Sequence, residues 1–420
     1  MKLSREFCVI LHNMENIQTT TLSNGLKVIF EPSSTGVAYC GYVVYAGTRN
    51  ELPNEDGMAH FIEHVSFKGT ERRNSWHINN ALESVGADLN AYTGKEETVY
   101  YTAIPKGELP RAIDVLSDMV FHSSYPQREI DKEVEVISDE IESYNDNPAE
   151  LIFDEFEELL FEGHPLGRNI LGNAARLKTY TTADAKEFAR RYYRPANCTF
   201  YVYADADFGR IVKLLEKATA GLDPAPAVKE DFALPAYKAQ EVVHDKKTHQ
   251  AHVIVGARGF GATDKRRTAF FLLNNILGGS GMSSRLNIIL REHSALVYTV
   301  ESYVCSYSET GVWGVYFGCD PGNVARCRRL LLAELNRITN VPLTPTRLLA
   351  AKRRLKGQLL LSRNSFNSYA ISMGRSYAKY NRYRDIDEQC RAIDALSAEE
   401  VMQAAKEVII PENLTTLIYK

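Results

Sequence analysis

The sequence predicts an α+β fold of two homologous domains, each a mostly antiparallel sheet covered by helices. The chain has 420 residues, which is too long for one ordinary hydrophobic core. A proline-containing segment near its middle has weak periodicity and fits a semi-extended linker. A helix–turn–strand unit also occurs once in each half. We therefore expect a domain at 1–222, a linker at 223–238 and a second domain at 239–420.

Both halves mix β-rich runs with stretches of helical periodicity. In the first half the expected strands are 26–31, 38–45 and 99–104, and the expected helices lie around Ala81 and at 111–120 and 151–161. The second half has the same mixture at 252–257, 268–277 and 312–317, and a long helix around 348–361. Such a mixture is typical of sheets that carry helices on their faces.

The repeated unit consists of a capped helix, a Pro-x-Asn turn and an extended β-rich run. Its first copy begins at Thr182 and passes through Pro195 into the run that ends at Tyr203. Its second copy begins at Ser397 and passes through Pro411. The two copies are separated by about 215 residues, close to half the chain. The alternative is chance similarity between two ordinary units.

The segment around His60, Glu63 and His64 is the strongest chemical motif in the chain. Residues four apart on a helix lie on the same face, so both imidazoles can reach one metal ion at the distance that zinc prefers. Glu63 lies beside the same site without having to be a ligand. The order H-x-x-E-H is the reverse of the commoner H-E-x-x-H of zinc proteases. The alternative is a pair of histidines that merely caps a partly buried helix face.

A zinc hydrolase also needs a third protein ligand. Residues 128–142 predict an acidic amphipathic helix with an apolar stripe. Glu133 and Glu140 are seven apart and share a face within about 20°. Helix phase alone does not choose among Glu133, Asp139, Glu140 and Glu142. A solvated acidic face, with no ligand at all, is the alternative.

The chain resembles the pitrilysin/insulinase family of inverted-motif zinc peptidases. It is most similar to the small bacterial members and to the catalytic subunit of the mitochondrial processing peptidase. The matching stretches are 46–51 (AGTRNE), 57–64 (GMAHFIEH) and 67–70 (FKGT). The resemblance implies a processing-peptidase-like fold, one Zn²⁺ per chain and the ligands His60, His64 and Glu140. It also implies that Glu133 orients a ligand by hydrogen bonding.

A glycine-rich turn at 278–286 precedes Arg291 and Tyr298. Such a turn before a helix could cradle phosphate, but this one lacks the Lys-Ser/Thr ending of a P-loop and the spacing of a dinucleotide fingerprint. The segment is similar to the G-G-x-x-S-S-R-L…L-R-E…L-x-Y pattern of the same peptidases. The resemblance implies that Arg291 and Tyr298 contact substrate backbone near the metal. Residues 293–295 (HSA) replace the family's more usual basic and glycine residues, so the shape of this loop stays open.

The family's N-A-x-T stretch falls on Asn90, Ala91 and Thr93. The resemblance places these substrate-binding residues on an edge strand beside the zinc. An exposed edge can pair with an extended peptide through main-chain hydrogen bonds. A simple turn into a strand is the alternative.

The resemblance implies a zinc metalloendopeptidase that cleaves peptides or unfolded polypeptides inside a clamshell chamber. Glu63 would act as the general base toward a water molecule. Relatives of this size are similar to half of the large single-chain enzymes, so we expect a homodimer in which Arg291 and Tyr298 complete the partner's site. The alternative from another class is a non-catalytic scaffold or partner subunit of the same fold.

Composition and charge exclude several other classes. The net charge of −4 gives no support for binding to nucleic acid or a membrane surface, and no stretch approaches the roughly 18 apolar residues of a membrane helix. The apolar run at 7–11 is too short for a convincing signal peptide, and Met1 or Met14 could be the true start. Seven scattered cysteines indicate reduced thiols, so we expect a cytoplasmic protein.

Overall fold

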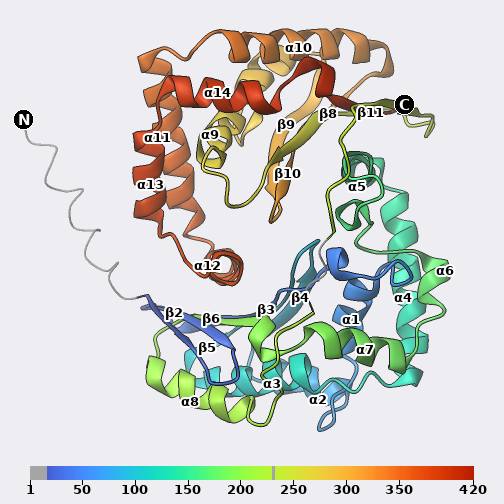
Figure 1. The fold of residues 1–420 in the computed structure, drawn as a ribbon, viewed down its shortest axis with the longest axis vertical. Coiled ribbons are helices and arrows are strands. Elements are labelled where there is room, and N and C mark those ends of the chain that lie inside the picture. Colours follow the sequence, from blue (N-terminus) through green and yellow to red (C-terminus); the bar gives the residue numbers. More distant parts are fainter. Residues whose placement is uncertain (1–16, 229–231) are drawn as a thin grey trace, which may run out of the picture. The chain divides into compact units, whose positions relative to one another are not determined.

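A computed structural model describes residues 17–228 and 232–420 of the chain, which form two compact units (Figure 1). Met1 and Met14, the two candidate starts, lie outside the described residues. Unit 1 takes its described residues from Met1–Ser138, Ile170–Glu230 and Arg363–Tyr383, and unit 2 from Asp139–Asn169, Asp231–Ser362 and Arg384–Lys420.

Unit 1 contains a six-stranded sheet with the strand order β1-β2-β6-β3-β5-β4. Among its described strands, β2 and β6 pair in parallel and the other neighbours are antiparallel. The strands are β1 (Gln18–Thr21), β2 (Lys27–Pro32), β3 (Val37–Val44), β4 (Asp88–Thr93), β5 (Thr98–Pro105) and β6 (Cys198–Ala204). The described strand β4 therefore forms one edge of this sheet.

Helices cover both faces of the unit 1 sheet. On one face Tyr42 packs edge-on against Phe121 of α3 at 5.3 Å between ring centroids. On the other face α12 comes so close at Gly374 that a Cβ there would lie 2.3 Å from the Tyr201 ring. The helices of this unit are α1 (Met58–Ser66), α2 (Ser75–Glu83), α3 (Leu109–Phe121), α4 (Gln127–Asn145), α6 (Ala174–Leu177), α7 (Thr182–Tyr192), α8 (Phe208–Ala218) and α12 (Phe366–Tyr380). The unit boundary falls inside α4, which is one continuous helix.

Unit 2 contains a five-stranded sheet with the strand order β7-β11-β8-β10-β9. Its strands are β7 (Glu241–His244), β8 (Ala251–Phe260), β9 (Val297–Ser306), β10 (Thr310–Cys319) and β11 (Thr415–Tyr419). Its helices are α5 (Pro148–Leu160), α9 (Arg267–Gly278), α10 (Val324–Asn340), α11 (Pro345–Ser362), α13 (Ile386–Ala395) and α14 (Ala398–Val408). Among the described helices of the chain, none is long and apolar enough to span a bilayer.

The two sheets share one topology, which confirms the predicted fold class. If the additional strand β1 is set aside, each sheet places its strands in the order first, fifth, second, fourth, third. In each, the first and fifth strands form the parallel pair. The repeated unit seen in the sequence corresponds to α7 with β6 and to α14 with β11. Both helices begin with a capping box, Thr181 with Asp184 and Ser397 with Glu400.

The units are not continuous stretches of sequence, unlike the expected ranges 1–222 and 239–420. The segment Asp139–Asn169 belongs to unit 2 because the apolar side chains of α5, among them Phe156, pack into a buried cluster on its sheet. The segment Arg363–Tyr383 belongs to unit 1 because α12 packs on β6 and β3. Each half of the chain therefore supplies a helix to the other half's sheet. Burial of an apolar helix face is the driving force.

Candidate metal centre

Helix α1 is held at its N-terminus by a buried carboxylate. Gly57 precedes the helix with φ of 82°, and a Cβ at this position would lie 2.8 Å from Gly172, so only glycine fits. The Glu51 carboxylate accepts from the backbone N–H groups of Gly57 at 3.1 Å and Ala59 at 2.9 Å. These are N–H groups that the helix itself leaves unpaired, and the negative charge also suits the positive end of the helix dipole.

The loop that follows α1, which contains residues 70–73, is also held by a buried carboxylate. Asp118, fully buried on α3, accepts hydrogen bonds from Thr70 at 2.8 Å, Arg72 at 2.9 Å and Arg73 at 2.5 Å. Burial acts to raise the pKa of Asp118, but these hydrogen bonds together hold it below its ordinary value. The helix that carries the two histidines is thus anchored at both ends.

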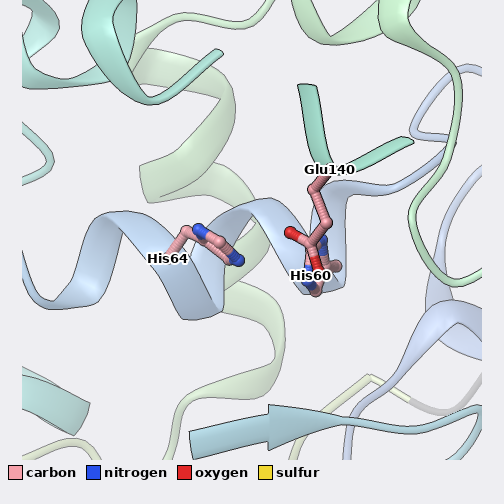
Figure 2. Close-up of side chains that lie close together, drawn as sticks. All are labelled: His60, His64 and Glu140. Carbon is pink, nitrogen blue, oxygen red and sulfur yellow. The ribbon is translucent and has the colours of Figure 1, made fainter. Parts of the chain in front are cut away.

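His60, His64 and Glu140 lie together, as the sequence predicted (Figure 2). The two imidazole rings are one helical turn apart, with centroids separated by 4.5 Å. One ligand atom from each of the three residues lies within 4.8 Å of the others. Glu140 comes from α4, one turn beyond Ile137, whose side chain is fully buried. Neither Asp139 nor Glu142 belongs to the group that the described residues form.

The electrostatics of His60 suit a metal ligand. Burial, and then the nearby charge of His64, lower the pKa of His60 to about 3. The imidazole is therefore neutral at physiological pH. A metal ion binds only the neutral ring, so no proton has to be displaced from His60.

Glu133 lies behind His64 and is buried. Its carboxylate contacts His64 Nδ1 at 3.0 Å and Lys68 Nζ at 2.7 Å. Burial acts to raise the pKa of Glu133, but the hydrogen bonds from these two residues lower it below its ordinary value. An ionised carboxylate at Nδ1 assigns the proton to that nitrogen and directs the lone pair of Nε2 outward. The donor set therefore fits a divalent metal such as zinc.

Glu63 lies on the same helix and is only 8% exposed. The hydroxyl of Thr93 donates a hydrogen bond of 2.7 Å to its Oε2. Thr93 closes the edge strand β4, which also carries Asn90 and Ala91. The Asn90 side chain accepts from the Ala91 N–H at 2.8 Å. The structure thus joins the edge strand to the acidic residue of the motif.

Arg291 and Tyr298 are carried by unit 2. Arg291 is exposed on a π-helical turn, Asn287–Glu292. Tyr298 lies on the edge strand β9, is 64% exposed, and donates a hydrogen bond of 3.0 Å to Asp320. Between them Ala295, one of the three residues that replace the family's more usual basic and glycine residues, has a positive φ of 50°. The turn therefore keeps a left-handed residue without a glycine.

Comparison with known proteins decides the family. The chain is 32% identical over 409 residues to an uncharacterized zinc protease of Streptomyces coelicolor, covering 95% of this chain and 88% of that protein. It is 30% identical over 415 residues to the mitochondrial-processing peptidase subunit beta of Bos taurus, covering 96% and 84%. This chain belongs to peptidase family M16. The resemblance inferred from the motifs is confirmed.

Two M16 family descriptions match successive parts of the chain. "Insulinase (Peptidase family M16)" matches residues 27–174, and "Peptidase M16 inactive domain" matches residues 179–355. The H-x-x-E-H motif lies in the first of these ranges. The crystal structure of a protease from Helicobacter pylori has the same fold, with a TM-score of 0.87 at 22% identity over 96% of this chain and 99% of that one.

Three contacts of this M16 chain were not foreseen from its sequence. Glu51 was noticed only as part of the AGTRNE stretch, although it caps α1. Lys68, in the FKGT stretch, is the second partner of Glu133. Thr93 was expected to bind substrate, and its hydroxyl bonds to Glu63. Each of the three residues lies inside a stretch that matches the family. Membership of that stretch was the sequence signal that could have pointed to these contacts.

Proposed function

We propose that this chain is a zinc-dependent endopeptidase that cleaves peptides or unfolded polypeptides. The observation that carries the proposal is the group of His60, His64 and Glu140 beside the buried Glu63. A neutral imidazole at His60 and the hydrogen bond between His64 and Glu133 both favour metal binding. The names of the curated relatives, which include zinc proteases, support the same metal.

His60, His64 and Glu140 would hold the zinc ion. When bound, zinc supplies a Lewis acid that polarises a carbonyl and lowers the pKa of a water molecule. Glu63 would take the proton from that water as it attacks the peptide carbonyl, and then pass it to the leaving amine. The hydrogen bond from Thr93 would keep the Glu63 carboxylate oriented during both transfers. Asn90 and Ala91 would hold an extended substrate along the free side of β4.

The test of catalysis is Glu63→Gln. The amide keeps the size of the side chain but cannot accept the proton, so we expect zinc content near one per chain and a turnover that is lower by roughly 10²–10⁴-fold or more. Glu83→Gln, at the exposed end of α2, removes the same charge from the same unit and should leave activity unchanged. Cleavage of an unstructured peptide library, with and without a chelator, reports activity and cut sites. Near-normal activity of Glu63→Gln would end the proposal.

We further propose that the active form is a homodimer in which Arg291 and Tyr298 act in the partner's site. Arginine offers a fixed fork of donors to peptide carbonyls, and the phenol can donate to the developing oxyanion. Both side chains are exposed and thus available to another molecule. The bovine relative is itself named as a subunit. A heterodimer with a different chain is the competing assembly.

Mixing inactive Glu63→Gln with inactive Tyr298→Ala tests the shared site. A mixed dimer pairs one intact Glu63 with one intact Tyr298. After full subunit exchange half of the dimers are mixed, so about a quarter of the wild-type specific activity should return. No recovery after verified exchange would exclude shared sites.

The second candidate is a non-catalytic scaffold. It is favoured by the description of an inactive domain over residues 179–355. That match does not include the H-x-x-E-H motif. The metal content of the purified protein separates the two candidate functions. About one zinc per chain supports the peptidase, and none supports the scaffold.

A further inference from the structure

Unit 2 contains a cavity of about 510 Å³ that the proposed peptidase chemistry does not use. It lies among the end of α9, the segment 283–289, the end of α10 and one face of α11. Its volume is within the range of small-molecule sites in proteins. All of its lining residues belong to unit 2.

One face of α11 combines charge with small apolar side chains. Arg347, Ala350, Ala351 and Arg354 line the cavity and follow the helical spacing of three, four and seven residues. The two alanines leave room between the two guanidinium groups. The rest of the lining combines apolar with polar side chains: Ile276, Ile288, Ile289 and Leu343, together with Ser283, Arg285 and Arg337. The site thus has an apolar body and a cationic border.

The charges of the cavity do not balance. Arg285 and Arg337 both pair with the buried Glu334, at 2.7 Å and 3.0 Å. Among the described residues, no carboxylate oxygen lies within 4.0 Å of a guanidinium nitrogen of Arg347 or Arg354, so neither arginine forms an ion pair. The charge of Arg347 still acts on Glu334: burial raises the pKa of this carboxyl, and Arg347 acts to lower it. This one carboxylate therefore faces several of the four arginines that line the cavity, and the lining keeps an excess of positive charge.

Arg354 is held in place by neutral groups. Its Nη2 donates to the Asn275 carbonyl at 2.7 Å and its Nε to the Asn275 side-chain oxygen at 3.1 Å. Burial lowers the pKa of Arg354, which marks a cation that has lost water without gaining an anion. A guanidinium group fixed in this way suits carboxylate or phosphate oxygens.

We infer that this cavity binds a small organic anion with an apolar body. A carboxylate or phosphate head would lie between Arg347 and Arg354, and an aliphatic or ring portion would lie against Ile276, Ile288 and Leu343. A purely inorganic anion would leave the apolar wall uncovered, and a neutral lipid would leave the excess positive charge of the lining unbalanced. Both parts of the ligand are therefore needed.

Calorimetric titration of the full chain tests the inference with octyl phosphate and octanoate, each below its micellar concentration. We expect one molecule per chain with a dissociation constant below about 1 mM for at least one of them, and the tighter of the two identifies the preferred head. Inorganic phosphate and 1-octanol, which each lack one part, should bind at least about tenfold more weakly. Failure of both anions to bind, or equal binding of 1-octanol, would overturn the inference.

A matched pair of variants assigns the binding to this cavity. Arg347→Gln removes one guanidinium from the exposed border and should weaken binding by about tenfold or more. Arg353→Gln removes the same charge from an exposed position of α11 outside the lining. It should change the dissociation constant less than about twofold, because dissolved salt screens the charge of Arg353 from the bound anion. Thermal melts of both variants should match the wild type because both residues are exposed. Unchanged binding in Arg347→Gln would place the anion elsewhere and refute the site.

Discussion

Replacing Thr93 by valine would remove a single hydrogen bond beside the proposed general base. Valine has nearly the same shape and suits a β-strand, so β4 should keep its pairing with β5. What disappears is the 2.7 Å hydrogen bond from the Thr93 hydroxyl to Glu63 Oε2. Because Glu63 is only 8% exposed, bulk water cannot fully replace that donor.

The size of the effect follows from the charge of the acceptor. A hydrogen bond to an ionised group contributes about 1.5–3 kcal/mol, and each 1.4 kcal/mol corresponds to about a factor of ten in rate. We therefore expect kcat/KM of Thr93→Val to fall by roughly 10- to 150-fold. The loss should appear in kcat if Thr93 orients Glu63, and mainly in KM if Thr93 only holds the substrate backbone.

Steady-state cleavage of a fluorogenic peptide measures both constants. Zinc content, determined on the same samples, should equal that of the wild type, since Thr93 is not among the proposed ligands. Thr93→Ser keeps the hydroxyl and should recover most of the activity. A Thr93→Val enzyme within twofold of wild-type kcat would refute the orienting role.

Three further outcomes follow from contacts described above. Glu133→Gln should lower zinc affinity about 10- to 100-fold in chelator competition, whereas the exposed Glu135→Gln should not. Gly374→Ala gains about 1 kcal/mol of helix propensity but drives a Cβ into the buried Tyr201 ring, which costs about 1–3 kcal/mol. Denaturant melts should therefore show a net loss of up to about 2 kcal/mol, and a more stable variant would contradict the close packing. Asp118→Asn should destabilise the protein by about 1.5–3 kcal/mol at neutral pH. Because the folded pKa of Asp118 is lowered, its contribution is present above the unfolded value of about 3.9 and is lost as pH falls through the folded one, so the gap between wild type and variant should close in acid.

The metal centre was predictable where it depends on local geometry. His60 and His64 share a face through helical spacing alone. Glu140 was different, because helix phase left four acidic candidates and only the family resemblance selected one. The choice depends on how α4 is rotated against α1, which burial of Ile130 and Ile137 sets in the folded chain. That rotation is a tertiary property.

The contacts that support the site were harder to foresee. Thr93 and Glu63 are 30 residues apart and meet only because β4 pairs at the edge of the sheet beside α1. The exchange of α5 and α12 between units was also out of reach, because domain prediction from sequence assumes continuous segments. The positions of individual strands were predicted more accurately. The expected strands at 26–31 and 312–317 lie within β2 and β10 apart from one residue. Local patterns predict elements, and long-range packing decides their neighbours.

The exchange of α5 and α12 makes the linker a poor place to cut this polypeptide. A fragment ending near residue 222 would carry α5 without its sheet and would lack the helix that Gly374 brings against Tyr201. The fragment that follows the linker would expose the apolar side chains of its sheet against which Phe156 of α5 normally packs. A proteolytic nick at that point should therefore leave two pieces that stay interlocked under native conditions, while each piece produced separately should aggregate.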